Sequence, residues 1–369
     1  MFSTEYQDIL KQINQINPVA YGRTRNFVDG SVTKLSPYIS RGCISTKQIF
    51  QSVLDQGFHL NKIEKFIREL AWRDYWQQVW INKKEGINQD IKREQPDVQN
   101  QEMPKALINL ATGIHAIDLA LKDFYETGYL HNHVRMYIAC IACNIGGSHW
   151  REPAKWMYYH LLDGDWASNA LSWQWVSGAN AGKKYYANQQ NINKYCYSNQ
   201  KGTFMDVEYE KFYRMEIPSV LQETVIPKLK TPLPKKQEIQ LDLSLPTLIY
   251  NWYNLDPKWH QNERVNRVLL LEPSIFEKYP ISKNAVTFML GLLKNIPGIQ
   301  IFVGEFSDLI EKYQTENVIY KEHPLNDYRG TEEPRDWMFS VSGYYKSFFA
   351  FWKQCQKELK QWNPPTLFG

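Results

Sequence analysis

The chain has 369 residues and a formal net charge of +4, with 43% hydrophobic and 22% charged residues. That length can bury a large core and favours about two domains. No uncharged apolar run reaches the ~18 residues of a membrane span, and the N-terminal segment lacks the apolar centre of a secretory signal. We therefore expect no membrane association and a cytoplasmic location. The five cysteines are irregularly spaced and do not indicate a disulfide framework.

The small positive charge lies in the first part of the chain. Residues 1–215 carry 25 basic and 21 acidic residues, whereas residues 216–369 carry 18 of each. Any affinity for a polyanion should therefore reside in the first part, although so small an excess is also ordinary surface variation.

Residues 1–215 are predicted to be almost wholly helical. Apolar positions recur at intervals of three and four through residues 63–80, 117–125 and 156–162, which is the period of a helix with one buried face. The following stretch, residues 225–237, is rich in proline and lysine, and proline denies helix continuation. We expect a linker there, at residues 216–240.

The pattern changes after the linker. Short apolar runs at residues 245–253, 267–272, 299–304 and 317–320 alternate with helical stretches at residues 282–295 and 305–314. Strands that alternate with helices indicate βαβ units and a small, mostly parallel sheet. Residues 344–362 are typical of an amphipathic helix. The expected fold is mainly α: a helical domain over residues 1–215, then a small α/β, Rossmann-like domain over residues 241–369.

Two segments near the N-terminus could serve a ligand. Thr33 and Ser36 stand just before Pro37, at a helix entry whose hydroxyls and free N–H groups could hold a phosphate or merely cap the helix. Further on, Glu69, Trp72 and Arg73 fall at i, i+3 and i+4, hence on one helix face. An acid, a large ring and a base are unusual on a core face, although a Glu69–Arg73 surface pair is the simpler alternative.

A third segment repeats this spacing in a strongly apolar helix. It contains Asn132, Arg135 and Met136, and an arginine there should be paired or contact a ligand because burying a lone charge is costly. His131 and His133 are two residues apart and so lie on different helix faces. We therefore predict no metal site.

The fourth segment runs from Asp163 to Trp175. Asp165, Asn169 and Trp173 form an i, i+4, i+8 stripe of acid, amide and indole that could line a cofactor ring. Capping of the helix by Asp163 and Asp165 is compatible with that role.

Together these segments resemble the photolyase and cryptochrome family. The family pattern runs T-S-x-L-S-P, E-L-x-W-R, H-N-R-x-R-M and D-G-D-x-A-x-N-x-x-x-W-Q-W. This chain has V-T-K-L-S-P, E-L-A-W-R, H-N-H-V-R-M and the last motif in full. Order and intervals agree from Tyr21 to Gly182.

The resemblance implies FAD as the cofactor and assigns its contacts. The phosphates and sugar would be held by Tyr21, Thr33, Leu35 and Ser36, in a cavity also lined by Phe66 and Arg73. Around the isoalloxazine, Arg135 and Asp163 would form an ion pair, Asp165 would bind the ring edge and Asn169 would face N5.

The resemblance also implies light-driven repair of cyclobutane pyrimidine dimers, with dimer-containing DNA as the partner. The residues that match the pocket for the flipped dimer are Glu69, Trp72, Asn132, Met136 and Trp175. Trp173 and Trp150 match the inner members of the tryptophan chain that photoreduces FAD. No protein partner is indicated.

Three departures keep a cryptochrome-like photoreceptor without repair activity as the alternative, and a flavin-binding remnant as a third. His133 replaces an arginine that contacts DNA, and the outer tryptophan of the chain is missing, because its place falls near Asp97. Family members begin with an α/β antenna domain, whereas this sequence begins at the helical part. We expect an antenna-like module at the C-terminus, and its chromophore stays open. Asn169 argues for repair, since plant-type receptors tend to carry Asp there and animal-type receptors Cys.

Overall fold

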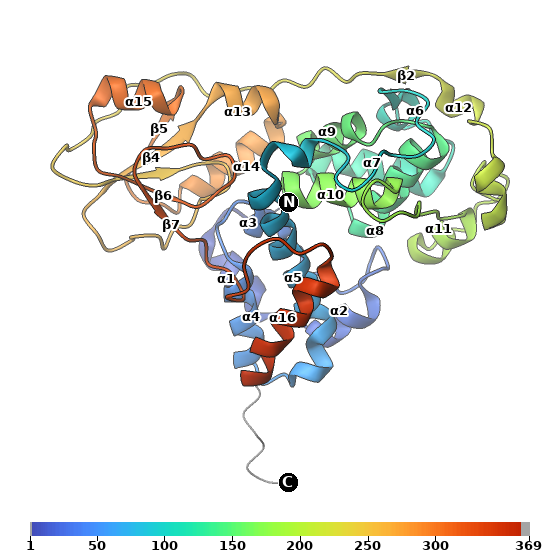
Figure 1. Ribbon diagram of the computed structural model, residues 1–369, viewed down its shortest axis with the longest axis horizontal. Helices are drawn as coiled ribbons and strands as arrows, with labels where there is room; N and C mark the ends of the chain where they lie inside the picture. Colours follow the sequence, from blue (N-terminus) through green and yellow to red (C-terminus); the bar gives the residue numbers. More distant parts are fainter. Residues whose placement is uncertain (1, 363–369) are drawn as a thin grey trace, which may run out of the picture.

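The computed structural model describes residues 2–362. Its first part is a set of helices, shown in the centre, the lower half and the right of Figure 1. The helices are α1 (Tyr6–Asn14), α2 (Pro18–Thr24), α3 (Ser36–Ser40), α4 (Thr46–Asp55), α5 (Leu60–Lys83), α6 (Lys105–Ile108), α7 (His115–Thr127), α8 (Asn132–Ala139), α9 (Arg151–His160), α10 (Trp166–Ser177), α11 (Gln189–Cys196) and α12 (Ser219–Gln222). Short 3-10 segments occupy Lys84–Asn88 and Tyr209–Arg214.

Helix α5 is the longest and lies at the centre of this part. Its buried positions, among them Ile63, Phe66 and Ile67, follow the expected helical period. They let α5 contact α2, α4 and α10. The same helix carries the side chains of Glu69, Trp72 and Arg73, so its packing fixes where they point.

Helices α8 and α10 supply the other side of the helical core. After Ala139 the chain continues from α8 as a π-helical segment, Cys140–Ile145. Helix α10 begins after Asp165, whose side chain accepts a hydrogen bond from Ser168 N, and ends at Gly178, where φ is +91°. A left-handed conformation at a helix end is a position that glycine adopts at little cost.

The C-terminal part contains a five-stranded sheet in which all neighbours are parallel, in the order β5-β4-β3-β6-β7. The strands are β3 (Thr247–Tyr250), β4 (Asn266–Leu271), β5 (Ile299–Val303), β6 (Val318–Lys321) and β7 (Thr331–Glu333), with helices α13 (Pro273–Lys278), α14 (Lys283–Leu293) and α15 (Phe306–Tyr313) between them. Four strands and helices α14 and α15 lie where the sequence predicts them. Strand β7 was not predicted.

The two faces of the sheet are covered differently. Leu248, Tyr250 and Leu269 belong to the large core shared with α14 and the helical part, whereas Ile249 and Val268 pack on the face covered by α15. Successive strand residues point to opposite faces, so both faces of these strands are apolar.

The linker region contains structure that the sequence did not indicate. Helix α12 lies within residues 216–240, and the two-residue strand β2 (Thr224–Val225) pairs with β1 (Met103–Pro104) in antiparallel register. Strands this short carry no periodic signal. The pairing ties the end of the helical part back to its middle.

The two parts of the chain share one core, and both chain ends take part in it. Near the N-terminus, Tyr6 N donates to Asn295 Oδ1 at 2.9 Å. The final helix, α16 (Phe348–Gln361), returns to the helical part and packs against α5, as the red ribbon beside the blue helices in Figure 1 shows.

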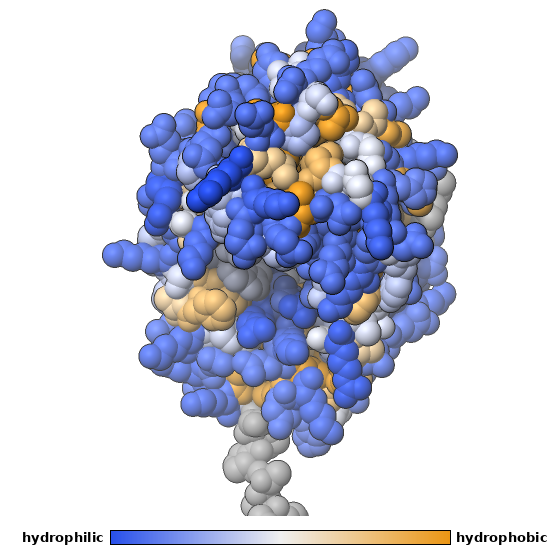
Figure 2. All heavy atoms as spheres, turned by 90° about the vertical axis from the view of Figure 1, so that its right-hand side faces the viewer, coloured by the Kyte–Doolittle hydropathy of each residue, from blue (hydrophilic) through white to orange (hydrophobic). Residues whose placement is uncertain are grey.

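No helix in the described part of the chain combines the length and apolar character needed to span a bilayer. Figure 2 views the molecule from the side on which α11 and α12 lie in Figure 1. Hydrophilic residues cover most of that face, and hydrophobic ones gather only in small groups.

Candidate functional site

Asp163 forms the centre of a buried polar cluster. Both of its carboxylate oxygens accept hydrogen bonds from Arg135 Nη2, at 2.9 and 3.0 Å, and Arg135 Nε donates to Leu130 O at 2.8 Å. Burial raises the pKa of Asp163, but the charge of Arg135 and the Ser36 hydroxyl outweigh burial and hold the pKa below its ordinary value. The arginine in the apolar helix is therefore paired, as expected.

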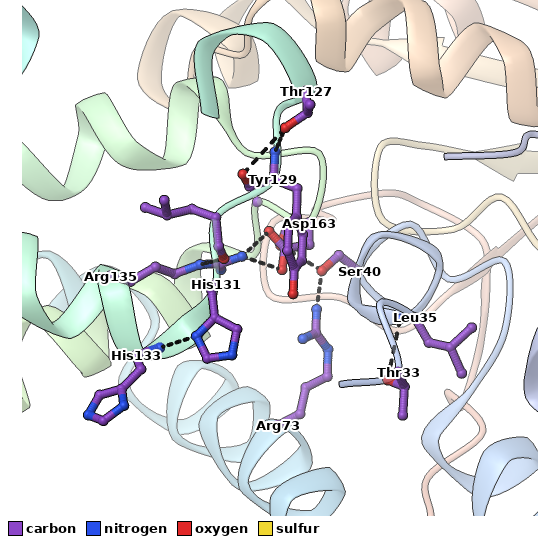
Figure 3. Close-up of polar contacts among 12 residues, drawn as sticks. Thr33, Leu35, Ser40, Arg73, Thr127, Tyr129, His131, His133, Arg135 and Asp163 are labelled. Atoms are coloured by element: carbon purple, nitrogen blue, oxygen red, sulfur yellow. Dashed lines mark hydrogen bonds and ion pairs between the residues drawn. The ribbon is translucent and has the colours of Figure 1, made fainter. Parts of the chain in front are cut away.

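A second arginine approaches this cluster from α5. Arg73 Nη2 donates to Ser40 Oγ, and the Ser40 hydroxyl donates to the backbone carbonyl of Asp163 at 2.7 Å. Figure 3 shows Arg135 and Arg73 converging on Asp163 from α8 and α5. Helices α3, α5 and α8 and the loop before α10 thus meet at one point.

The alternative of a Glu69–Arg73 pair is wrong, because both residues have other partners. Arg25 Nη2 donates to Glu69 Oε1 at 3.1 Å across the α2–α5 contact. Burial raises the pKa of Glu69, and Arg25 counteracts part of that rise. Arg73 is thereby left to face Ser40 and Asp163.

Asp165 and Asn169 lie at the start of α10. Asp165 caps the helix through Ser168 N at 2.7 Å, and its other oxygen accepts a hydrogen bond from Gln77 Nε2. Asn169 Nδ2 donates to Ala154 O at 2.8 Å. The capping expected of Asp165 is confirmed, whereas Asp163 serves the ion pair.

The residues expected to hold phosphates and sugar lie on α2, on α5 and in the turn that leads into α3. Tyr21 and Phe66 meet edge to face with ring centroids 5.2 Å apart. Thr33 Oγ1 accepts from Leu35 N at 3.4 Å, in a turn where Lys34 has a φ of +53°. This turn leads into α3 at Ser36.

His131 and His133 take separate partners, in keeping with their placement on different helix faces. His131 Nδ1 accepts from His133 N at 3.2 Å, and His133 Nδ1 lies 2.9 Å from Asn26 O. Burial lowers the pKa of His131 to about 4, so this ring is neutral. Its Nε2 is buried and has no hydrogen-bond partner among residues 2–362.

Trp72 is covered by a residue from the far end of the chain. The ring of Phe348, the first residue of α16, stacks on Trp72 with centroids 3.7 Å apart and planes 9° apart. The ring of Trp76 lies beside that of Trp72, with centroids 4.9 Å apart. Met136 is half-buried and Asn132 exposed, both on α8.

The remaining tryptophans differ in their exposure. Trp173 and Trp150 are buried, and Trp150 Nε1 donates to Asp90 Oδ1 at 2.6 Å. Trp175, at the other end of α10, is exposed beside Tyr185. Asp97, near which the outer tryptophan was expected, pairs with Lys184.

The polar groups of this site suit a large ligand that carries both phosphates and a flat ring. Arg73 and Arg135 supply positive charge from α5 and α8, and the unpartnered Nε2 of His131 is one further buried hydrogen-bonding atom. The rings of Tyr21 and Phe66 pack edge to face, and Lys34 Nζ lies 5.8 Å from the centre of the Tyr129 ring.

The family model described as the FAD binding domain of DNA photolyase matches residues 66–250, half of the chain. The chain belongs to this family. The photolyase of Streptomyces griseus is 30% identical over 152 residues, covering 40% of this chain and 32% of that protein. A cryptochrome DASH of Ostreococcus tauri is 29% identical over 184 residues, covering 47% and 33%. The chain thus spans about a third of the length of the curated relatives it matches.

A solved cryptochrome of Synechocystis sp. PCC6803 superposes with a TM-score of 0.45 at 23% identity, over 52% of this chain and 43% of that one. The cofactor of the family is FAD, and the charge and ring chemistry of the site fits it. Arg73, Arg135 and Asp163 are polar residues of this site that could hold it.

Sequence reasoning missed several members of this site. Arg25 lies four residues after Tyr21, an expected FAD contact, and its charge was a usable signal. Ser40 and Gln77 are hydrogen-bond partners that only the packing of helices reveals. Phe348 gave no signal, because its contact with Trp72 joins residues far apart in the chain.

Proposed function

We propose that the chain is a light-driven enzyme that repairs cyclobutane pyrimidine dimers in DNA. When bound and reduced, FAD supplies the photoexcited electron that splits the dimer and accepts it back afterwards. Several of the relatives are named deoxyribodipyrimidine photo-lyase, which supports this choice. The observation that carries it is the face of α5, where Glu69 and Trp72 stand beside Arg73 and hence beside the Asp163 cluster.

The residues of this chain would position both reactants. The Arg135–Asp163 pair would place a guanidinium beside the ring system, where it would favour a reduced, anionic flavin. Asn169 offers an amide, which can donate or accept at N5. Glu69 and Asn132 would hydrogen-bond the flipped pyrimidines.

The division into domains follows the same proposal. The helical part over residues 1–215 would carry the flavin, residues 216–240 would link, and residues 241–369 would form a small α/β, Rossmann-like domain with the final helix. The parallel order of β3 to β7 supports that assignment.

Phe348 bears directly on repair, because a base that stacks on Trp72 needs the face that Phe348 covers. In this proposal Phe348 turns away when damaged DNA binds. A stacked aromatic pair contributes about 0.5–1.5 kcal/mol beyond area burial, which corresponds to about a two- to tenfold loss of affinity for the lesion.

The same contact favours the second candidate, a blue-light photoreceptor without repair activity. In a receptor Phe348 would stay on Trp72 and close the pocket permanently. His133, where the family pattern has an arginine, also supports this candidate, because it weakens attraction to phosphates near neutral pH: burial lowers its pKa.

The test is repair of UV-irradiated oligothymidylate by fully reduced, FAD-loaded protein under blue light. Repair restores the ultraviolet absorbance of thymine in light and not in darkness. If FAD-replete protein restores no thymine absorbance in light, the repair function is contradicted. The photoreceptor then stands as the proposed function.

A pair of neighbouring variants tests the role of Phe348. Phe348→Ala should bind dimer-containing DNA more tightly than the wild type, by about two- to tenfold. Phe349→Ala is the control, because the adjacent ring is 66% exposed. Equal binding by the two variants would show that Phe348 does not compete with the lesion.

A further inference from the structure

A cavity of about 420 Å³ lies between the helical part and the sheet, separate from most residues assigned to FAD. One wall comes from Ser40, Arg73, Gln77 and Asp165, and the other from residues that follow β3 and end β6. Its volume is in the range of small-molecule sites, about 300–1,000 Å³.

The position in the sheet is where parallel sheets bind ligands. The chain builds β3, β4 and β5 outward in one direction and then returns to place β6 on the other side of β3. The order therefore reverses between β3 and β6, and a crevice opens at their carboxyl ends. Asn251 and Asn254 follow β3, and Lys321 and His323 end β6 at this crevice.

Arg335 lines this cavity, and one edge of its guanidinium makes no hydrogen bond within residues 2–362. Its Nη1 donates to Gln77 Oε1 at 2.6 Å. The Nε and Nη2 atoms are buried and have no hydrogen-bond partner in the described part of the chain. These two N–H groups form the side of the guanidinium that binds a carboxylate or phosphate through two parallel bonds.

Two more buried groups in the cavity wall leave donors free. His323 Nδ1 accepts from Leu325 N at 3.2 Å, so in the neutral ring the hydrogen is on Nε2, which has no partner within residues 2–362. Asn254 Nδ2 is also buried and has no hydrogen-bond partner within residues 2–362. A buried N–H without an acceptor is costly, so four unpartnered donor atoms on three side chains of the cavity lining indicate a ligand that accepts hydrogen bonds.

None of the acidic residues of the wall accepts a hydrogen bond from these donor atoms, and each accepts hydrogen bonds from other groups. They are Asp74 (Thr46 and Met338 N), Asp165 (Gln77 and Ser168 N), Asp256 (Lys258 N), Glu322 (Trp337 and Arg335 N) and Asp336 (Ser45, with Lys47 as ion partner). With Arg335, the basic residues Arg73, Lys258 and Lys321 make four against these five acidic ones, so the preference for an oxyanion rests on the free donors and not on net charge.

We propose that this cavity binds a small metabolite through an oxyanion, a phosphate or a carboxylate, which the free edge of Arg335 grips and His323 and Asn254 help to hold. The site is distinct from the proposed repair function and does not depend on it. It shares Ser40, Arg73 and Asp165 with the flavin site, and Gln77 joins Arg335 to Asp165.

The experiment is calorimetric titration of FAD-loaded protein with adenosine monophosphate, inorganic phosphate and succinate. We expect one saturable site per chain for at least one of them. Binding of phosphate and the nucleotide but not of succinate identifies a phosphate ligand, and the reverse identifies a carboxylate. Heat of binding is measured without light or DNA, so its outcome is independent of repair.

Arg335→Gln should weaken that binding by about tenfold or more, as loss of a charge-assisted contact does. Asn254→Asp, which keeps the shape and replaces a donor by a charge, should weaken it similarly and serves if Arg335→Gln does not fold. Arg329→Gln is the control, since it removes an exposed charge outside the cavity wall. No binding of any probe at millimolar concentration, or equal binding by wild type and both cavity variants, overturns the proposal.

Discussion

At the scale of single residues, the Arg135–Asp163 pair decides the character of the flavin site. The Asp163 side chain is 5% exposed and that of Arg135 21%, so the pair is largely removed from water. Neither residue could be buried alone at acceptable cost, and each therefore fixes the position of the other. A buried pair with a free guanidinium face is a means of holding charge next to a cofactor.

Arg135→Gln should destabilise the protein by about 2–4 kcal/mol, because it leaves Asp163 buried without its cation. Chemical denaturation measures this cost, and flavin content after purification should fall with it. Arg23→Gln, on the exposed side of α2, is the control and should change stability by less than about 0.5 kcal/mol. If Arg135→Gln leaves the denaturation midpoint and the flavin content unchanged, the pair supports neither the stability of the protein nor the binding of flavin.

Asp74 predicts a pH dependence of the opposite sign to that of a paired acid. Burial raises its pKa to about 6 from 3.8, although Met338 N and Thr46 donate to it. A raised carboxyl pKa means that the folded state holds the proton more tightly. The resulting stability is full below pH 3.8 and is lost as the pH rises through about 6.

Asp74→Asn keeps an acceptor for both donors and removes this titration. The difference in Tm between variant and wild type should therefore grow in favour of the variant as the pH rises from 4 to 7. A difference that stays constant over this interval would mean that Asp74 titrates normally in the folded protein.

At the scale of elements, the spacing of apolar residues predicted the helices and strands that depend only on the local sequence. Helices α5 and α7 and strands β3 to β6 lie at the predicted places, because one buried face or a short apolar run is a local property. Strand β7 has the sequence Thr-Glu-Glu and is largely exposed, so no apolar pattern marks it. The π-helical turn at Cys140–Ile145 is hidden in the same way within a continuous apolar run.

The residues of the candidate site likewise fall into those that the local sequence predicts and those that it does not. Motif spacing places Arg135, Asp163, Asp165 and Asn169 on facing elements, and the structure brings the first two into contact. The partners Arg25 of Glu69 and Phe348 of Trp72 come from elements whose approach depends on tertiary packing. Their positions could not follow from the motifs.

The amphipathic helix α16 gives a direct test of its packing. Phe351 is buried at 1% exposure in α16, whereas Phe349, two positions earlier, is 66% exposed. Phe351→Ala should cost about 3–5 kcal/mol of unfolding free energy and Phe349→Ala close to none, as urea denaturation of the FAD-loaded protein can show. Similar small losses in both would mean that α16 does not dock on α5.

At the scale of the whole molecule, the sheet and the helices are joined by specific contacts as well as by a shared apolar core. Leu255 N donates to Arg41 O at 2.8 Å, and the Arg41 guanidinium lies 3.3 Å over the ring of Trp252. Ser282 N donates to Tyr159 O at 2.8 Å. The proposed metabolite cavity lies at this junction, so a ligand there would bind both parts of the chain at once.

The claim on which the whole account depends is that the helical part binds FAD. The most direct measurement is the flavin content of the purified full chain, before and after incubation with FAD, by absorption in the near-ultraviolet and blue and by release of the cofactor on denaturation. The account predicts about one FAD per chain, held without a covalent bond. The Arg135→Gln variant should contain less FAD than the wild type. A protein that is colourless as purified and takes up no FAD would contradict it.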